Sequence, residues 1–413
     1  MSGNPISACR YCAAPLHFSV VDLGAQPFSN SYPRPHEIDR ERRYPLHVRL
    51  CTNCLLAQTD FDALPEAIFS AEYAYFSSYS ATWVAHARDY AAAMIARYGL
   101  GKDSMVVEVA SNDGYLLQHF LSSSVPCLGV EPTQGTASVA MAKGVPTEIA
   151  FFGEKTARNL VARGYAADLM AANNVLAHVP DIADFVRGFT VLLKREGVAT
   201  FEFPHLLELF RRHAFDTIYH EHYFYLSLHA VDRIFLKCGL RIFDIERLST
   251  HGGSLRAFAC RSAAAHREMP SVADIRREER EAGLACASGY GGLELSVANI
   301  KSGIRSFLDA ALSRGKSVAA IGAAAKGSTF LNTCDLTTED IAFVADVNSR
   351  KQGRVMPGSH IPIVAPEELR ARRPDYVLIL PWNLKTEIMD QLADIRRWGG
   401  HFVAAIPQLE VIS

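Results

Sequence analysis

Residues 216–223 place ionisable and hydrogen-bonding side chains at consecutive positions between two apolar runs. Tyr219, His220, Glu221 and His222 can together supply a base near neutral pH, a group that orients it and a donor for a developing oxyanion. Solvated loops rarely have this composition, and a group of four such side chains favours catalysis over the simple burial of a histidine. The segment therefore predicts proton-transfer chemistry.

The division of labour within this segment depends on where each side chain points. In an extended backbone Glu221 cannot face the same way as His222, because successive side chains point to opposite faces. Either Glu221 or His220 is then expected to point inward with the help of a neighbour. A metal site at His220 and His222 is a weaker alternative, because no third ligand is evident nearby.

Two C-x-x-C pairs carry a second kind of chemistry: Cys9 with Cys12, and Cys51 with Cys54. Each pair can offer two thiolates from one tight turn, and four thiolates suit a tetrahedral zinc ion. Four sulfur ligands leave no open position for substrate or water, so the zinc is expected to be structural. The remaining cysteines stand among apolar neighbours and are expected to be buried thiols. They are Cys127, Cys238, Cys260, Cys286 and Cys334.

An ordered series of elements precedes residues 216–223. A helical pattern over residues 81–98 leads to an apolar strand, and the small-residue turn after that strand can bring backbone N–H groups close to a ligand. The second strand ends in Glu131, whose carboxylate can accept hydrogen bonds from both hydroxyls of a ribose. The series predicts a Rossmann-like domain. Its strands are expected at 105–109, 127–130, 167–171 and 197–203.

A second nucleotide-fold pattern occupies the C-terminal part of the chain. A charge-rich solvated helix and linker is expected at 264–285, a helix at 293–314, and a G-x-A-x-x-G turn at 322–327. Alone, this half suggests a rival hypothesis, a nicotinamide-dependent oxidoreductase. Lys326 and Lys351 favour instead a pyrophosphate held by side-chain cations and backbone N–H groups. The strands of this half are expected at 317–321, 341–345, 376–380 and 401–404.

Six motifs occur in a fixed order along the chain: residues 108–114, 129–132, 174–178, 203–205, 219–222 and 250–256. Together they resemble the S-adenosylmethionine-dependent C-methyltransferases of nucleotide-linked deoxysugars. The resemblance covers nearly the whole chain, since that family also combines a cysteine zinc module, a methyl-donor domain and a C-terminal nucleotide-fold domain. It implies methyl transfer from S-adenosylmethionine, through an enolate, to carbon 3 of a nucleoside-diphosphate-4-keto-6-deoxyhexose. Carbon 5 of a related sugar is the alternative, because both carbons flank the ketone.

The resemblance also implies roles for single residues. His222 is the expected base, and Tyr219, Glu221, His178 and Tyr75 are the expected supporting or replacement groups. The residues expected to bind the cofactor are Glu108, Ser111, Asn112, Gly114, Glu131 and Asn173. Those expected to bind the nucleotide sugar are Lys326, Ser328, Asn332, Lys351, Trp382 and Asn383. The expected zinc ligands are Cys9, Cys12, Cys51 and Cys54.

The expected fold class is therefore α/β. It comprises an N-terminal zinc-binding module, a central Rossmann-like S-adenosylmethionine-dependent methyltransferase domain and a C-terminal Rossmann-like α/β domain. The expected boundaries are 1–65 for the zinc module, 66–265 for the methyltransferase domain, 266–299 for a helical linker and 300–413 for the nucleotide-sugar domain.

Composition limits the classes of partner. With 413 residues, 49% of them hydrophobic and 21% charged, the chain has enough apolar material for several cores. A net charge of −2 and the lack of a Lys/Arg block argue against nucleic acid or a membrane surface as a partner. A cytoplasmic monomer is expected. A non-enzymatic sugar-nucleotide scaffold is a third hypothesis, which the intact Glu108, Gly114 and Glu131 disfavour.

Overall fold

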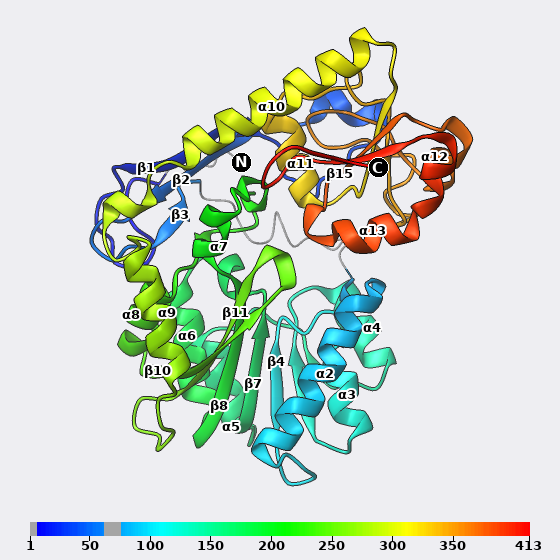
Figure 1. Cartoon of the computed structure of the whole chain (residues 1–413). Helices are drawn as coiled ribbons and strands as arrows, with labels where there is room; N and C mark the ends of the chain where they lie inside the picture. Colours follow the sequence, from blue (N-terminus) through cyan, green and yellow to red (C-terminus); the bar gives the residue numbers. More distant parts are fainter. Residues whose placement is uncertain (1–5, 62–75) are drawn as a thin grey trace.

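Three β-sheets form the framework of the described residues, 6–61 and 76–413, in the computed structural model (Figure 1). The largest sheet lies in one half of the molecule, and the N-terminal strands and the C-terminal domain lie in the other half. Helix α10 (Leu293–Ser313) runs along that second half. Within the described residues, none of the helices is both long and apolar enough to cross a membrane.

The N-terminal sheet is antiparallel and has the order β1-β2-β3-β9. Its first three strands are β1 (Phe18–Gln26), β2 (Tyr44–Leu50) and β3 (Ala57–Thr59). The fourth strand, β9 (Phe224–Tyr225), comes from far along the chain and follows directly on the 216–223 segment. The pairing of Ala57 with Tyr225 and of Gln58 with Phe224 therefore fixes that segment against the N-terminal module.

The central sheet has seven strands in the order β10-β11-β8-β7-β4-β5-β6. All neighbours pair in parallel except β11, which is antiparallel to both β8 and β10. The four strands expected from the sequence are present, and β6, β10 and β11 add to them. The strands are β4 (Val106–Val109), β5 (Cys127–Val130), β6 (Thr147–Glu148), β7 (Ala167–Asn173), β8 (Leu193–Pro204), β10 (Leu240–Leu248) and β11 (Ser254–Arg261).

Helix α2 (Ala81–Tyr98) matches the predicted range. The Ser80 hydroxyl accepts a hydrogen bond from the Trp83 N–H at 3.2 Å and caps its start, and Gly99, at φ 60°, ends it in the left-handed region. The other helices of the central domain are α3 (Leu117–Ser122), α4 (Gln134–Ala142), α5 (Glu154–Ala162), α6 (Ile182–Leu192), α7 (Leu206–Arg211) and α8 (Leu228–Lys237).

The charge-rich segment forms α9 (Pro270–Glu281). The sequence suggested that all its charges are solvated, but one of them is buried. Glu279 is only 2% exposed. Its carboxylate accepts hydrogen bonds from the backbone N–H groups of Leu228 and His229 at 2.6 and 2.8 Å, and pairs with His205 at 2.7 Å. Glu279 therefore caps the start of α8 from another helix, a role that no local pattern reveals.

The C-terminal sheet has the order β14-β13-β12-β15-β16-β17, and only β17 is antiparallel. The four expected strands are present, although the one expected at 341–345 is shorter. The strands are β12 (Val318–Ile321), β13 (Val344–Ala345), β14 (Ile363–Val364), β15 (Tyr376–Ile379), β16 (His401–Ala404) and β17 (Glu410–Ile412). The helices are α11 (Ala325–Thr333), α12 (Glu367–Arg372) and α13 (Lys385–Gln391).

One apolar core joins parts of the chain that lie far apart in sequence. It contains Val48 of β2, Phe215 directly before residues 216–223, Leu308 of α10, and Phe330 and Trp382 of the C-terminal domain. The segment around residue 216 is therefore buried between the N-terminal module and the C-terminal domain.

Candidate active site and zinc centre

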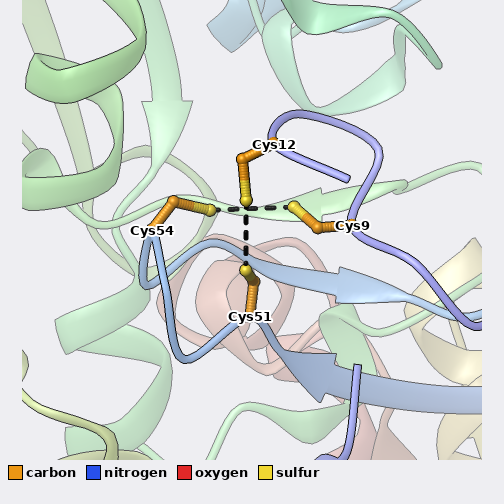
Figure 2. A group of neighbouring side chains, drawn as sticks. All are labelled: Cys9, Cys12, Cys51 and Cys54. Carbon is orange, nitrogen blue, oxygen red and sulfur yellow. Dashed lines mark hydrogen bonds between the residues drawn. The ribbon is translucent and has the colours of Figure 1, made fainter. Parts of the chain in front are cut away.

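The four cysteines of the two C-x-x-C pairs converge on one point (Figure 2). Their sulfur atoms all lie within 4.8 Å of one another, with Cys9 and Cys54 at 3.7 Å and Cys12 and Cys51 at 3.4 Å. A tetrahedral ion with Zn–S bonds of about 2.3 Å separates its ligands by about 3.8 Å. The arrangement thus fits a structural zinc ion, as predicted.

The protein supports these thiolates from two matching turns. Ala13 and Leu55, each directly after the second cysteine of a pair, both adopt φ 58°. The Gln58 amide donates to Cys9 Sγ at 3.1 Å, and the Asn53 amide lies 3.4 Å from Cys12 Sγ. The contact between the two sulfur atoms lowers the pKa of Cys9 and raises that of Cys54, because one proton is shared between them.

The remaining cysteines follow the prediction with one exception. Cys127, Cys238, Cys260 and Cys334 are buried, but Cys286 is exposed. Cys286 stands in a turn after α9, where its apolar neighbours in sequence do not enclose it.

The expected cofactor residues gather where β4 and β5 end. Asn112 and Gly114 of the turn after β4 adopt φ 49° and 75°. Glu131, directly after β5, accepts hydrogen bonds from the backbone N–H groups of Asn112 at 3.0 Å and Thr133 at 2.9 Å. Its carboxylate therefore holds the turn after β4 against the end of β5. Burial raises the pKa of Glu131, against the effect of these hydrogen bonds.

Three further expected cofactor residues, Glu108, Ser111 and Asn173, lie at the same edge. Within the described residues, neither the Ser111 hydroxyl nor either polar atom of the Asn173 side chain has a hydrogen-bond partner. Burial raises the pKa of Glu108 well above its usual value. Unsatisfied buried polar atoms are rare in proteins and mark a place where a polar ligand fits.

The catalytic candidates His222, His178 and Tyr219 come together as expected. The ring centroids of His222 and His178 are 4.6 Å apart, and those of His222 and Tyr219 are 4.0 Å apart. His222 Nδ1 lies 2.9 Å from the Thr217 carbonyl oxygen. A carbonyl only accepts, so Nδ1 carries the proton and Nε2 keeps the lone pair that a base needs.

Burial controls the charge of this group of imidazoles. It lowers the pKa of His178 to about 4 and that of His222 well below its usual value. A positive charge on His178, or on Lys326, would lower the pKa of His222 further. Both rings are thus neutral near pH 7, the state in which His222 can accept a proton.

His220 and Glu221 contact groups other than those around His222, because the backbone turns here, with the His222 N–H donating to the Tyr219 carbonyl at 2.9 Å, instead of running extended. The His220 ring packs edge-on against Phe28 and Phe61, and its Nε2 contacts the Pro45 carbonyl at 3.1 Å. Glu221 accepts a hydrogen bond from the Asn30 amide at 2.5 Å. His220 is thus a packing residue of the N-terminal module.

Two of the expected substrate residues, Lys326 and Lys351, are cations that point inward. Lys326 Nζ donates to the His251 carbonyl at 3.3 Å and lies 5.2 Å from the centroid of the Trp382 ring. Lys351 Nζ donates to the Ala323 carbonyl at 2.6 Å. Burial lowers the pKa of both lysines, and Asp216 opposes this effect at Lys326.

The other expected substrate residues are engaged within the protein. The Ser328 hydroxyl donates to the Ser29 carbonyl at 2.9 Å, and the Asn332 amide to the Pro357 carbonyl at 2.9 Å. The Trp382 indole N–H donates to Asp216 at 2.8 Å, and Asn383 follows it on the 3₁₀ helix η7 (Trp382–Leu384). Tyr75, the last expected catalytic residue, lies outside the described residues.

The sequence did not single out two groups at this site. His251, at φ 54°, stacks edge-on with Trp83 at 5.7 Å, and its carbonyl binds Lys326. Glu202, at the end of β8, pairs with Arg256 at 2.5 Å and with His86 at 2.9 Å. The motif at residues 250–256 contained His251 and Arg256, but nothing local connects it to His86 on α2.

Three family models match successive parts of the chain. They describe a zinc binding domain at residues 9–69, a methyltransferase domain at 83–245 and a C-methyltransferase C-terminal domain at 249–407. The C-methyltransferase NovU of Streptomyces niveus is 35% identical over 411 residues, which cover 99% of this chain and 98% of that protein. The chain belongs to this family of C-methyltransferases, and the expected three-part α/β fold is confirmed.

Solved structures of other methyltransferases match parts of the chain. Magnesium protoporphyrin IX methyltransferase from Synechocystis is 16% identical, with a TM-score of 0.34, over 44% of this chain and 82% of its own. The methyltransferase CcbJ from Streptomyces caelestis is 13% identical, with a TM-score of 0.34, over 43% of this chain and 90% of its own.

Proposed function

We propose that this C-methyltransferase uses S-adenosylmethionine to methylate carbon 3 of a nucleoside-diphosphate-4-keto-6-deoxyhexose. The observation that carries the proposal is the geometry of His222, whose Nδ1 is bonded to the Thr217 carbonyl and whose ring lies beside those of His178 and Tyr219. A carbon next to a ketone becomes a nucleophile only after it loses a proton. The site thus supplies the step that methylation of carbon requires. Carbon 5 is the alternative, because it flanks the same ketone.

In the proposed reaction, His222 Nε2 takes the proton from the carbon, and the electron pair moves into the enolate. Tyr219 and His178 lie where they can support His222 and donate toward the enolate oxygen. S-adenosylmethionine supplies the methyl group as a cationic sulfonium, which the carbon nucleophile attacks. Glu221, held by Asn30, is assigned to positioning, and Tyr75 is a candidate acid.

S-adenosylmethionine fits the edge formed by the ends of β4, β5 and β7. The turn at Ser111, Asn112 and Gly114 can approach its methionine part, and Glu131 its ribose. The buried, unsatisfied polar atoms of Ser111 and Asn173 support a polar ligand at this place.

The nucleotide sugar is proposed to lie between this edge and the C-terminal domain. Lys326 and Lys351 are buried cations of the C-terminal domain, and they suit the pyrophosphate. Ser328, Asn332 and Asn383 are proposed to shape the nucleotide site at the ends of the C-terminal strands. We also propose that one chain forms the complete site.

The test separates proton removal from methylation. The protein is incubated in deuterated water with a 4-keto sugar nucleotide and S-adenosylhomocysteine, which fills the cofactor site without a methyl group. Wild type is expected to exchange the proton at the carbon that is methylated. His222→Ala should keep both ligands bound and lose about a hundredfold or more of the rate.

The matched control is His220→Phe, which keeps an aromatic ring in the packing site of the N-terminal module. It should exchange at the wild-type rate in its folded fraction. A His222→Ala variant that exchanges as fast as wild type would move the base to Tyr219, Glu221, His178 or Tyr75. NMR of the product formed with S-adenosylmethionine distinguishes carbon 3 from carbon 5.

A further inference from the structure

A short helix links the C-terminal domain to the catalytic histidine. This 3₁₀ helix, η4 (Phe215–Thr217), forms the start of the segment that contains His222. Asp216 is fully buried, and its Oδ2 accepts a hydrogen bond from the Trp382 indole N–H at 2.8 Å. The bond joins residues 166 positions apart, one in the central domain and one in the C-terminal domain. A buried carboxylate depends on such a donor, because it has lost its hydration.

The residues that follow Asp216 are held in the same way. The Thr217 carbonyl accepts the Nδ1 proton of His222 at 2.9 Å. The next carbonyl, that of Ile218, accepts a hydrogen bond from the Thr329 hydroxyl of α11 at 2.9 Å. Thr217, which fixes the orientation of His222, is therefore flanked on both sides by anchors in the C-terminal domain.

The surroundings of Trp382 argue against direct contact with the nucleotide. Its side chain is buried, with 7% of the residue exposed, and its N–H is already used by Asp216. The ring packs so closely on Gly252 that a Cβ there would lie 2.7 Å from the ring, and Gly252 has φ 89°. Lys326 faces the ring at 5.2 Å. The nucleobase of the substrate could not stack on a ring enclosed in this way.

We propose that Asp216 and Trp382 are positioning residues, whose hydrogen bond fixes the orientation of His222 from the C-terminal domain through the Thr217 carbonyl. The assignment rests on the proposed function, because it concerns the base of that reaction. It replaces the direct contact with substrate that the sequence suggested for Trp382. The domain proposed to bind the sugar nucleotide thereby also aligns the base that acts on the sugar.

The first test is Trp382→Phe, which keeps a ring beside Lys326 and removes the N–H. The probes are dTDP-4-keto-6-deoxyglucose and its UDP counterpart, whichever wild type exchanges in deuterated water. The exchange rate at saturation should fall about tenfold or more, because a misplaced catalytic group loses rate steeply. The Kd for the nucleoside diphosphate should stay within about twofold. A nucleotide-binding role would instead raise that Kd and leave the saturated rate unchanged.

Trp398→Phe is the matched control. Trp398 also donates its indole N–H, at 3.1 Å to the Pro374 carbonyl, but within the C-terminal domain. The Trp398→Phe variant should exchange the substrate proton at the wild-type rate. Thr329→Val, which removes the hydroxyl bonded to Ile218, is a second and milder variant and should slow exchange several-fold. It also tests the proposal if Trp382→Phe does not fold.

Rescue and coupling give the sharpest readout. Asp216→Asn keeps an oxygen that can accept the hydrogen bond from the Trp382 N–H. This variant should therefore exchange the substrate proton faster than Asp216→Ala. If the pair acts as a unit, Asp216→Ala combined with Trp382→Phe should be no slower than Asp216→Ala alone. Fully additive losses, or an unchanged rate in Trp382→Phe, would overturn the proposal. Absence of exchange in wild type would instead overturn the proposed function.

Discussion

The behaviour of His222 follows from its surroundings more than from its residue type. The Thr217 carbonyl selects its tautomer, and burial keeps the ring neutral. His220, two positions away, has the same side chain but lies against aromatic rings, where its pKa of about 4 has no catalytic consequence. The same residue type is therefore the proposed base in one case and a packing group in the other.

The pH dependence of proton exchange should reflect this burial. His222 acts as a base only when neutral, so a lowered pKa moves the acid limb of the rate profile to lower pH. The rate should stay constant from pH 7 down through the ordinary histidine value of about 6.5 and reach half its maximum clearly below it. The groups that face His222, namely His178, His251 and Lys326, push in the same direction. A half-maximal rate at or above pH 6.5 would contradict this account.

Glu131 gives a prediction for the cofactor. Glu131→Ala should weaken S-adenosylmethionine binding by about 1.5–3 kcal/mol, because it loses the proposed ribose bonds and two acceptors that hold the turn. Calorimetric titration measures the loss. Nucleoside diphosphate binding should be unchanged, and Glu131→Gln should recover part of the affinity. Equal losses for both ligands would place Glu131 outside the cofactor site.

At the scale of elements, the structure uses distant groups to hold short pieces of chain. The carboxylate of Glu279 accepts a hydrogen bond from the first N–H of helix α8 and also pairs with His205. The two-residue strand β9 pairs with β3, which belongs to the N-terminal part of the chain. These supports keep an irregular segment, residues 205–227, in place between the domains.

Glu279→Ala tests the first of these supports. It would leave two backbone N–H groups and the buried His205 without their partner, so the free energy of unfolding should fall by about 3 kcal/mol. Denaturant unfolding measures the change. The matched control is Glu281→Ala, on the exposed part of the same helix, which should stay within about 0.5 kcal/mol of wild type.

At the scale of the whole molecule, the zinc module is part of a shared core. Strands β1 and β2 pack in the same apolar core as α10 and the C-terminal domain. The cysteine cluster itself belongs to the core of the methyltransferase domain. The zinc module therefore connects the methyltransferase domain and the C-terminal domain through these two cores.

Zinc removal should accordingly lower stability before it changes chemistry. The protein should contain one zinc per chain by elemental analysis, and Cys51→Ser should lower the melting temperature by about 10 °C or more. Cys286→Ser, at the exposed thiol, is the control and should melt like wild type. Full zinc loss with unchanged stability but abolished turnover would indicate a catalytic metal.

The sequence by itself determined the features that local spacing encodes. The C-x-x-C pairs specified the zinc centre, and the run of apolar strands and turns specified both nucleotide folds, because strand and turn patterns depend on nearby residues. Alternation of side chains requires an extended backbone, but residues 219–222 form a turn, so it did not apply to Glu221 and His222. Only the tertiary structure decided that His222 lies beside His178 and Tyr219 while His220 packs against aromatic rings, that Glu279 is buried, and that Trp382 meets Asp216. These outcomes depend on contacts between residues far apart in sequence, where burial and hydrogen-bond partners are set by packing that no local pattern records.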